Sequence, residues 1–370
     1  AAHGQPSASD LPREPVRAVR LRSRDGVVPG SQTDDLEELA AQARGLGRGA
    51  RERSGAWPGK VLELAAELGR WAPHPGEGET LALWDLLATL GAADLGVARA
   101  VEPHLDALAI LHQAGQRPEE ATTWGVFAAE GRNARLEARE TQDGWRLDGV
   151  KPWCSLAGSV SHAVVTAYTG ESSRRAFRIR LASPGVVREP VPWTGHGLPG
   201  IVSAPVRFED VPAESVGVDG WYLERPGFAW GGIGVAAVWF GGAVGVARRL
   251  WSGYSSRGPD QIGLSQLGAV DLALGTARAA LAEAADDVDA GRAEGGAGAV
   301  LALRVRGVVA GAVELILAAV DHALGPAPLA FEDEHAQRVA DLRLYVRQHH
   351  AERDLAALGR SLLAEGSMPW

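Results

Sequence analysis

Side chains with the capacity for chemistry gather in three short stretches of the 370-residue chain. Residues 151–155 combine a lysine, an indole, a thiol and a hydroxyl. Glu332 stands in an acidic run as a carboxylate able to accept a proton. His349 and His350 add two imidazoles, which titrate near neutral pH. These groups suit proton transfer, whereas the one cysteine, Cys154, excludes a cysteine-rich metal cluster.

The composition limits the classes of function. The chain has 37 basic and 46 acidic residues, a formal net charge of −9, and offers no positive field to a nucleic acid. With 46% apolar and 22% charged residues it can bury a sizeable interior. A single cysteine fits a reducing cytoplasm, which we predict as the location. Residues 1–30 lack an apolar stretch, which predicts a flexible leader and not a signal peptide.

Three patterns of apolar spacing follow the leader and predict the domains that would position these groups. Residues 31–120 have helical spacing, with a glycine-rich break around Gly47. Residues 121–218 change to a period of two and predict an antiparallel β-barrel. Residues 219–366 return to helical spacing and predict a four-helix bundle, whose last helix runs over 336–363. The predicted fold class is α+β multidomain.

The stretch 228–247 carries no charged residue, is long enough for a transmembrane helix, and contains a small-xxx-small pair at Gly241 and Gly245. No second span accompanies it, and the glycines also suit a buried helix that another backbone or a flat ligand approaches closely. We therefore predict no membrane span. The apolar steps from Leu267 to Val288 suit a helix seam and are compatible with a homodimer or homotetramer.

One run of motifs suggests a family. The segment from Asp143 to Ser155, DGWRLDGVKPWCS, resembles the "dGy.lnG.K.wit" stretch of the acyl-CoA dehydrogenases. Shorter similarities follow at 184–186, 208–212 and 242–247, and the order of the predicted domains agrees with that family. The resemblance implies an N-terminal helical domain, a middle β-barrel, a C-terminal four-helix bundle, and FAD bound between barrel and bundle.

The resemblance also implies roles for individual residues at the flavin. It places Phe127 and Ala129 beside the cofactor, the indole of Trp153 against the isoalloxazine, and the hydroxyl of Ser155 near its reactive nitrogen. Arg257 corresponds to an arginine that contacts the FAD pyrophosphate. Without the motif, Trp153 would be interpreted as a core anchor of the barrel and Arg257 as an exposed residue in a turn that ends a helix.

The activity implied by the resemblance is dehydrogenation of a small-molecule acyl thioester such as an acyl-CoA. Aligning the family's C-terminal "RDa.iY" stretch with 340–345 assigns Glu332 as the base that removes the α-proton. The same carboxylate could instead cap the helix that follows it, because the positive end of a helix dipole attracts a negative charge.

Departures from the family pattern keep two further functions open. The loop 129–135 lacks the family's threonine and serine, the turn 325–328 lacks its glycine pattern, and Ala340 replaces an arginine. A two-component flavin monooxygenase of the same fold would use a histidine from the predicted His349–His350 helix. A non-catalytic scaffold would need neither loop. A metal site is disfavoured because adjacent residues on a helix point about 100° apart.

Overall fold

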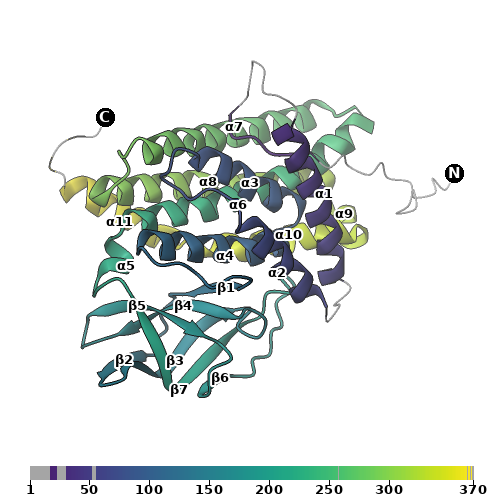
Figure 1. The fold of residues 1–370 in the computed structure, drawn as a ribbon. Coiled ribbons are helices and arrows are strands. Elements are labelled where there is room, and N and C mark those ends of the chain that lie inside the picture. The colour runs from purple at the N-terminus through teal and green to yellow at the C-terminus, as the bar shows by residue number, and fades with distance from the viewer. Residues whose placement is uncertain are drawn as a thin grey trace.

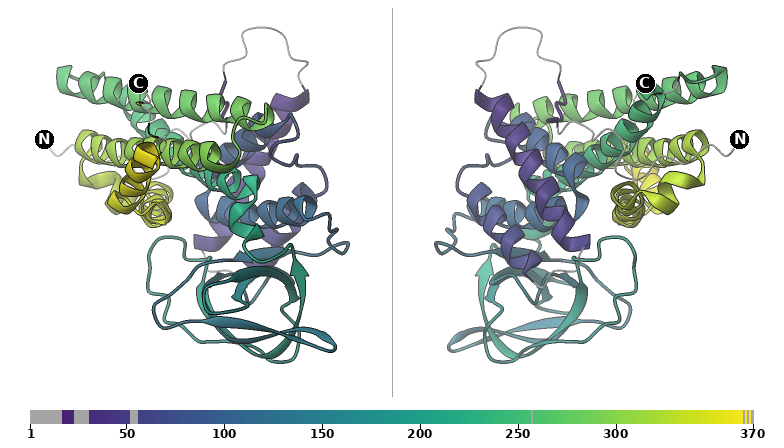
Figure 2. Two further views of the ribbon diagram at one scale, coloured as in Figure 1. Left: turned by 90° about the vertical axis from the view of Figure 1, so that its left-hand side faces the viewer. Right: turned by 90° about the vertical axis from the view of Figure 1, so that its right-hand side faces the viewer.

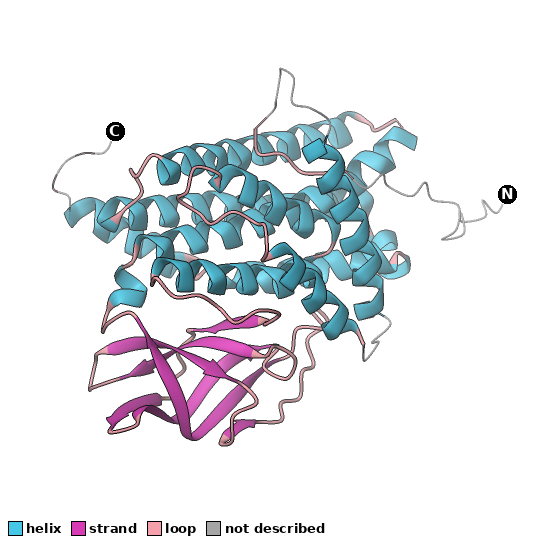
Figure 3. Ribbon diagram, in the orientation of Figure 1, coloured by secondary structure: helices cyan, strands magenta, loops and turns pink. Residues whose placement is uncertain are grey.

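The structure, a computed structural model, describes residues 17–22, 31–51, 56–256, 258–364, 366 and 368. Helices and strands are segregated in space: the strands, all from one continuous middle part of the chain, form a body beneath a stack of helices (Figure 3). Helices from both ends of the sequence pack together in that stack (Figure 1).

The N-terminal helices are α1 (Ser31–Arg51), α2 (Trp57–Leu68), α3 (Thr80–Ala93) and α4 (Leu95–Gln113). The predicted break around Gly47 is wrong, because α1 continues through it. A Cβ at Gly47 would lie 1.8 Å from the carboxylate of Asp94, so the glycine gives α1 a close approach to the start of α4.

Part of the predicted flexible leader is docked on α3. Val19 and Leu21 are buried, the Val19 N–H donates to Thr89 Oγ1 at 2.9 Å, and the Leu21 N–H donates to Asp85 Oδ1 at 2.7 Å. The polar side chains of an apolar, buried helix thus find backbone partners. Apart from 17–22, residues 1–30 lie outside the described part of the chain.

The seven strands are β1 (Trp124–Phe127), β2 (Leu136–Thr141), β3 (Gly144–Ser155), β4 (His162–Tyr168), β5 (Arg174–Arg180), β6 (Val186–Arg188) and β7 (Ser203–Val216). Six of them follow the order β1-β4-β2-β3-β7-β5, and β6 pairs with β7. The pairing of β4 with β5 closes the sheet into a barrel (Figure 2). Most pairs are antiparallel, as predicted, but β4 runs parallel to β1 and β2. Phe177 and Phe208 fill the core.

The C-terminal elements are α5 (Trp221–Glu224), α6 (Pro226–Ser256), α7 (Gln261–Asp289), α8 (Gly295–Leu324), α9 (Pro326–Phe331), α10 (Asp333–Tyr345), the 3-10 turn η1 (Val346–Gln348) and α11 (Glu352–Ala364). The helices α6, α7 and α8 pack on one another, and α6 also packs along α3. The two helical regions therefore share one apolar core.

The apolar stretch noted in the sequence lies within α6. Among the described residues α6 is the one helix long and apolar enough to cross a membrane, and 72% of its apolar window is buried inside the molecule. Its glycines permit close packing: a Cβ at Gly241 would lie 2.0 Å from the carbonyl oxygen of Ala88 on α3. This is the pattern of a helix buried among its neighbours.

The predicted last helix, 336–363, is broken. Helix α10 ends at Tyr345 and α11 begins at Glu352, with Ala351 in the left-handed region at φ 48°. His349 and His350 therefore lie in a turn and not on a helix. Gln348 and His350 of this segment line a cavity.

Candidate functional site

Two adjoining cavities lie where the barrel meets the helices. The junction cavity, about 930 Å³, is walled by α4, β1, β3, β7, α10 and η1. The inner cavity, about 500 Å³, continues between α4, α6 and α8. Residues shared by both walls are Tyr222, Leu223, Phe228, Arg306, Gln348 and His350.

Trp153 stands in the junction cavity with 62% of its surface exposed. The register of β3 and β7 shifts here, since Lys151 pairs with Val206 while Cys154 pairs with Ala204, leaving one extra residue on β3. Trp153 takes a left-handed φ of 57°, which is uncommon for a bulky side chain. Because a bulge re-aims a side chain, the indole faces the cavity and is not the core anchor of the alternative interpretation.

Ser155 ends β3 at the same wall. Its Oγ accepts a hydrogen bond from Arg99 Nη2 at 3.1 Å and lies 2.7 Å from Ser203 Oγ. The other terminal nitrogen of Arg99, Nη1, is buried and has no hydrogen-bond partner among the described residues. A buried donor that makes no hydrogen bond has a free-energy cost, which a ligand oxygen at this wall would relieve.

Glu102, one turn along α4 from Arg99, borders the inner cavity. Its Oε2 accepts from the Tyr345 hydroxyl at 3.3 Å and lies 3.6 Å from Arg99 Nη1. Burial raises the pKa of Glu102 to about 7, against the opposing charge of Arg99. Burial likewise raises the pKa of Asp106, against the opposing charge of Arg225, on the same cavity wall.

The predicted flavin residues meet different outcomes. Ala129 lines the junction cavity together with Val126 and Ala128. Phe127 does not, because its ring is 1% exposed and packs in the barrel core, facing the opposite side of the strand from Val126. Arg257 lies outside the described residues, so its contact with a pyrophosphate stays a prediction.

The motif lysine, Lys151, is buried and holds the loop that follows β1. Its Nζ donates to Glu130 Oε1 at 2.8 Å and to Thr166 Oγ1 at 2.9 Å. Burial lowers the pKa of Lys151, and Glu130 opposes that shift. The lysine therefore supports the cavity wall instead of facing the cavity.

The structure does not bring Glu332 to either cavity, so its assignment as the base stays a prediction that this placement does not favour. Arg249 Nε and Nη2 donate to its two carboxylate oxygens at 2.6 and 2.7 Å. These hydrogen bonds lower its pKa, the reverse of what a base near neutral pH needs. Glu332 precedes α10, about 18 Å along the helix axis from the cavity residue Leu344.

The two histidines differ in environment. The His350 side chain is 66% exposed and lines both cavities. The His349 side chain is 10% exposed, and its pKa is lowered by burial, against the charge of Asp354. No group of three or more His, Cys, Asp or Glu residues in the described part of the chain is arranged to hold a metal ion.

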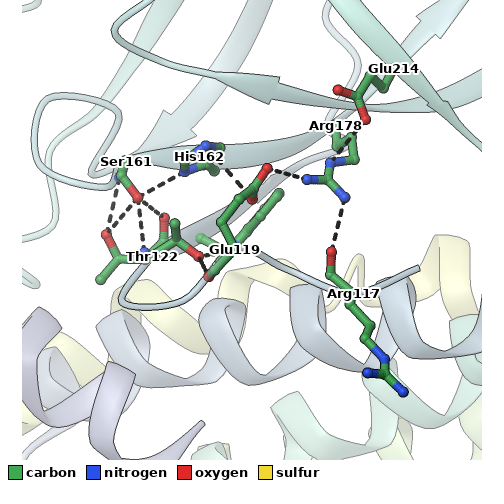
Figure 4. Close-up of polar contacts among 9 residues, drawn as sticks. Arg117, Glu119, Thr122, Ser161, His162, Arg178 and Glu214 are labelled. Atoms are coloured by element: carbon green, nitrogen blue, oxygen red, sulfur yellow. Dashed lines mark hydrogen bonds and ion pairs between the residues drawn. The ribbon is translucent and has the colours of Figure 1, made fainter. Parts of the chain in front are cut away.

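A second polar cluster occupies the outside of the barrel, where the linker 117–123 crosses β4 and β5 (Figure 4). Glu119, His162 and Ser161 are the residue types of a hydrolytic triad. However, Ser161 Oγ donates to the Thr123 carbonyl at 3.0 Å and accepts from the Thr123 N–H at 2.9 Å. Arg178 also ties Glu119 and the Arg117 carbonyl to β5. The cluster fastens the linker to the barrel and leaves no free nucleophile.

The junction cavity fits a flat ring system with polar edges. The exposed indole of Trp153 offers a stacking face, while Ala128 and Ala129 leave room beside it. Ser155 and Nη1 of Arg99, which makes no hydrogen bond among the described residues, offer polar atoms to the ring edge. These residues match what an isoalloxazine requires.

Sequence reasoning missed Arg99 and Glu102. A signal was present, since both charged residues interrupt an otherwise apolar stretch of α4, where Val101 and Leu105 are buried. A charge at such a position calls for a partner from another element. That partner, Tyr345, is 243 residues away in the chain.

No protein-family model and no curated protein matches the chain. Solved structures match almost all of it. Butyryl-CoA dehydrogenase from Megasphaera elsdenii has a TM-score of 0.74 at 19% identity, covering 92% of this chain and 100% of that one. KijD3, in complex with FMN and dTDP-3-amino-2,3,6-trideoxy-4-keto-3-methyl-D-glucose, has 0.74 at 18%, covering 92% and 95%. PigA, with FAD and proline, has 0.74 at 16%, covering 92% and 99%.

The chain therefore has the fold of the acyl-CoA dehydrogenases, and the resemblance inferred from the sequence is confirmed at the level of the fold. The flavin differs between these neighbours, FMN in KijD3 and FAD in PigA.

Proposed function

We propose that this chain is a flavin-dependent oxidoreductase that holds its flavin in the junction cavity. The observation that carries the proposal is Trp153, an indole that a strained bulge directs out of the barrel core and into the cavity. A bulky side chain in the left-handed region is costly, and such strain is concentrated at functional sites. FAD, our first candidate from the motifs, and FMN share the ring system that this wall would contact.

The residues at the wall would each have a defined task. Trp153 would cover one face of the ring and exclude water from it. Ser155, held by Arg99 and Ser203, would present a fixed hydroxyl to the ring edge. When bound, a flavin supplies the capacity to accept or donate two electrons, which the amino acid side chains here lack.

For the reaction, we favour oxidation of a small polar molecule over dehydrogenation of a fatty acyl thioester. The inner cavity is bordered by Glu102, Asp106, Arg225 and Arg306, which would be costly to desolvate against an alkyl chain. The neighbours KijD3 and PigA were solved with polar molecules, an amino sugar nucleotide and proline.

A two-component monooxygenase is the second candidate, favoured by His350 on the wall of both cavities. An imidazole at the flavin could donate or accept a proton during reaction with oxygen. Oxygen uptake that depends on an added NADH–flavin reductase would support it. Bleaching of a flavin by butyryl-CoA under anaerobic conditions would support acyl thioester dehydrogenation instead.

The test of the proposed function is flavin binding to the purified chain. We expect FAD or FMN to raise the melting temperature, because a ligand that binds only the native state stabilises it. Trp153→Ala should weaken that binding by about tenfold or more through loss of the stacking face. Trp71→Ala removes an equally exposed indole, 57% accessible, that borders neither cavity and should not change it.

A melting temperature unchanged by saturating FAD and FMN would refute the proposed function and favour the non-catalytic scaffold. The cytoplasmic location and the homodimer or homotetramer are further parts of the proposal. Fractionation of cells and light scattering of the purified chain test them.

A further inference from the structure

Glu102 is a carboxyl group at the boundary of the two cavities. It lines the inner cavity, while its hydrogen-bond partner Tyr345 and its neighbour Arg99 line the junction cavity. The residue as a whole is 9% exposed. Only Oε2 is engaged, by Tyr345 and Arg99; within the described part of the chain Oε1 accepts no hydrogen bond.

The charged groups around Glu102 come from several elements. Arg99 and Asp106 lie on α4, Tyr345 on α10 and Arg306 on α8. Burial favours the protonated form, Arg99 and Arg306 favour the ionised form, and Asp106 favours the protonated form again. Arg306 is committed elsewhere, since it donates to the carbonyls of Gly232 and Gln348 at 2.7 and 3.1 Å.

This balance leaves the carboxyl close to half-protonated near neutral pH, because its pKa is about 7. A group that transfers protons during a reaction works best under that condition. Two other carboxylates at the cavities are engaged by basic side chains: Glu130 is paired with Lys151, and Asp354 lies 3.7 Å from His349 Nε2.

Arg99 connects this carboxyl to the predicted flavin wall. Its guanidinium donates to Ser155 Oγ at 3.1 Å and stands 3.6 Å from Glu102 Oε2. A change of charge at the wall would therefore be felt at Glu102 across one side chain, in an interior where charges are poorly screened.

We propose that Glu102 is the residue that exchanges a proton with the substrate of this site, and this rests on the proposed flavin-dependent oxidation. Dehydrogenation of a substrate amine or hydroxyl in the inner cavity releases one proton and one hydride. The N–H or O–H bond breaks, the electron pair stays on the substrate, and the proton forms a bond to a carboxylate oxygen of Glu102. The adjacent substrate C–H bond also breaks, its electron pair would leave with the hydrogen as hydride to the bound flavin, and Glu102 itself is neither oxidised nor reduced.

Two measurements on the same protein test the proposal. The first is a carbon-13 NMR pH titration of chain labelled at the glutamate side-chain carboxyl carbon. The second is the number of protons taken up when the flavin-loaded protein is photoreduced, read with a pH indicator in weakly buffered solution between pH 6 and 8. A charge that appears on reduction should raise proton occupancy at Glu102.

We expect one carboxyl signal to titrate near pH 7 and to disappear in Glu102→Gln, together with the part of the proton uptake that is centred near that pH. Glu332→Gln is the matched control, because its carboxylate is paired outside both cavities, and both readouts should match those of the unaltered protein. Tyr345→Phe removes a hydrogen bond that favours the ionised form, so it should shift the titration to higher pH. This variant carries the test if Glu102→Gln does not fold.

Proton uptake that is the same with and without the Glu102 carboxyl would overturn the proposal, as would the absence of any glutamate that titrates above pH 6. The NMR titration needs no flavin. If a glutamate titrates near pH 7 as expected but the protein binds no flavin, the proposed function is refuted, and so is proton exchange at Glu102 coupled to flavin reduction. The burial and the hydrogen bond of Glu102 would not be contradicted.

Discussion

His104 provides a quantitative test of how the barrel is joined to the helices. It is 2% exposed, and its Nδ1 accepts a hydrogen bond from the Trp124 N–H at 3.2 Å, which links α4 to β1. The ring must be neutral to accept that bond. Burial accordingly lowers the pKa of His104 from 6.5 to about 4.

The size of the effect follows from this shift. The folded state binds the proton less readily than the unfolded state, so the stabilisation is fully present above pH 6.5 and is lost as the pH falls toward 4. At 1.36 kcal/mol per pKa unit, the loss amounts to about 3 kcal/mol. His104→Gln keeps an acceptor but cannot titrate. Its stability should therefore fall less between pH 7 and pH 4, by about that amount.

The assay is urea unfolding of both proteins at pH 7 and at pH 4. The readout is the fall in unfolding free energy from pH 7 to pH 4 in the unaltered protein minus the same fall in His104→Gln. Groups common to both proteins cancel in it. Equal pH dependence of the two proteins would refute the reasoning, because His104 would then carry the same charge in the folded and unfolded states.

Four other perturbations have clear expected outcomes. Gly241→Ala should lower the free energy of unfolding by about 1–3 kcal/mol, because the new Cβ would meet the Ala88 carbonyl. Gly311→Ala should raise the free energy of unfolding by about 0.5–1 kcal/mol, because Gly311 lies on the exposed face of α8 and its Cβ would have nothing within 4 Å. Urea unfolding measures both changes. The Cys154 thiol, whose pKa burial raises to about 12, should react with a disulfide reagent only after unfolding, and rapid reaction of the native protein would contradict its burial. Glu332→Ala removes the two hydrogen bonds that the half-buried Arg249 donates to this carboxylate and should cost about 1–3 kcal/mol of stability. Flavin affinity should not change, as a parallel thermal shift with FAD would show.

Local spacing predicted much of the fold. The change from helical to alternating apolar residues falls between Gln113 and Trp124, where the helices give way to strands. Helix α6 was visible as an uncharged, glycine-containing run. The errors arose where tertiary packing overrides local preference. Gly47 does not end α1; its missing Cβ instead leaves room for the side chain of Asp94. The segment 336–363, predicted as one helix, breaks at Ala351.

The residues of the candidate site were likewise predicted only in part from the sequence. The motif around Trp153 and Ser155 was readable because the residues are adjacent and their types are specific. Glu332 was assigned by counting residues back from 340–345, which carries no information on how the chain folds, and in the structure it lies outside both cavities. Phe127 was assigned to the cavity although the alternation along β1 turns its ring into the barrel.

By itself, then, the sequence determined the order of the helical and strand regions, the apolar surfaces that they bury, and the motif that contains Trp153 and Ser155. Only the tertiary structure decided that a register shift against β7 exposes Trp153, and that α4 and α10 bring Glu102 and Tyr345 together. The physical reason is the separation along the chain between the interacting residues. Periodicity and motifs act between near neighbours in the chain, whereas burial, pairing and the pKa of a carboxyl depend on groups that folding collects from distant positions.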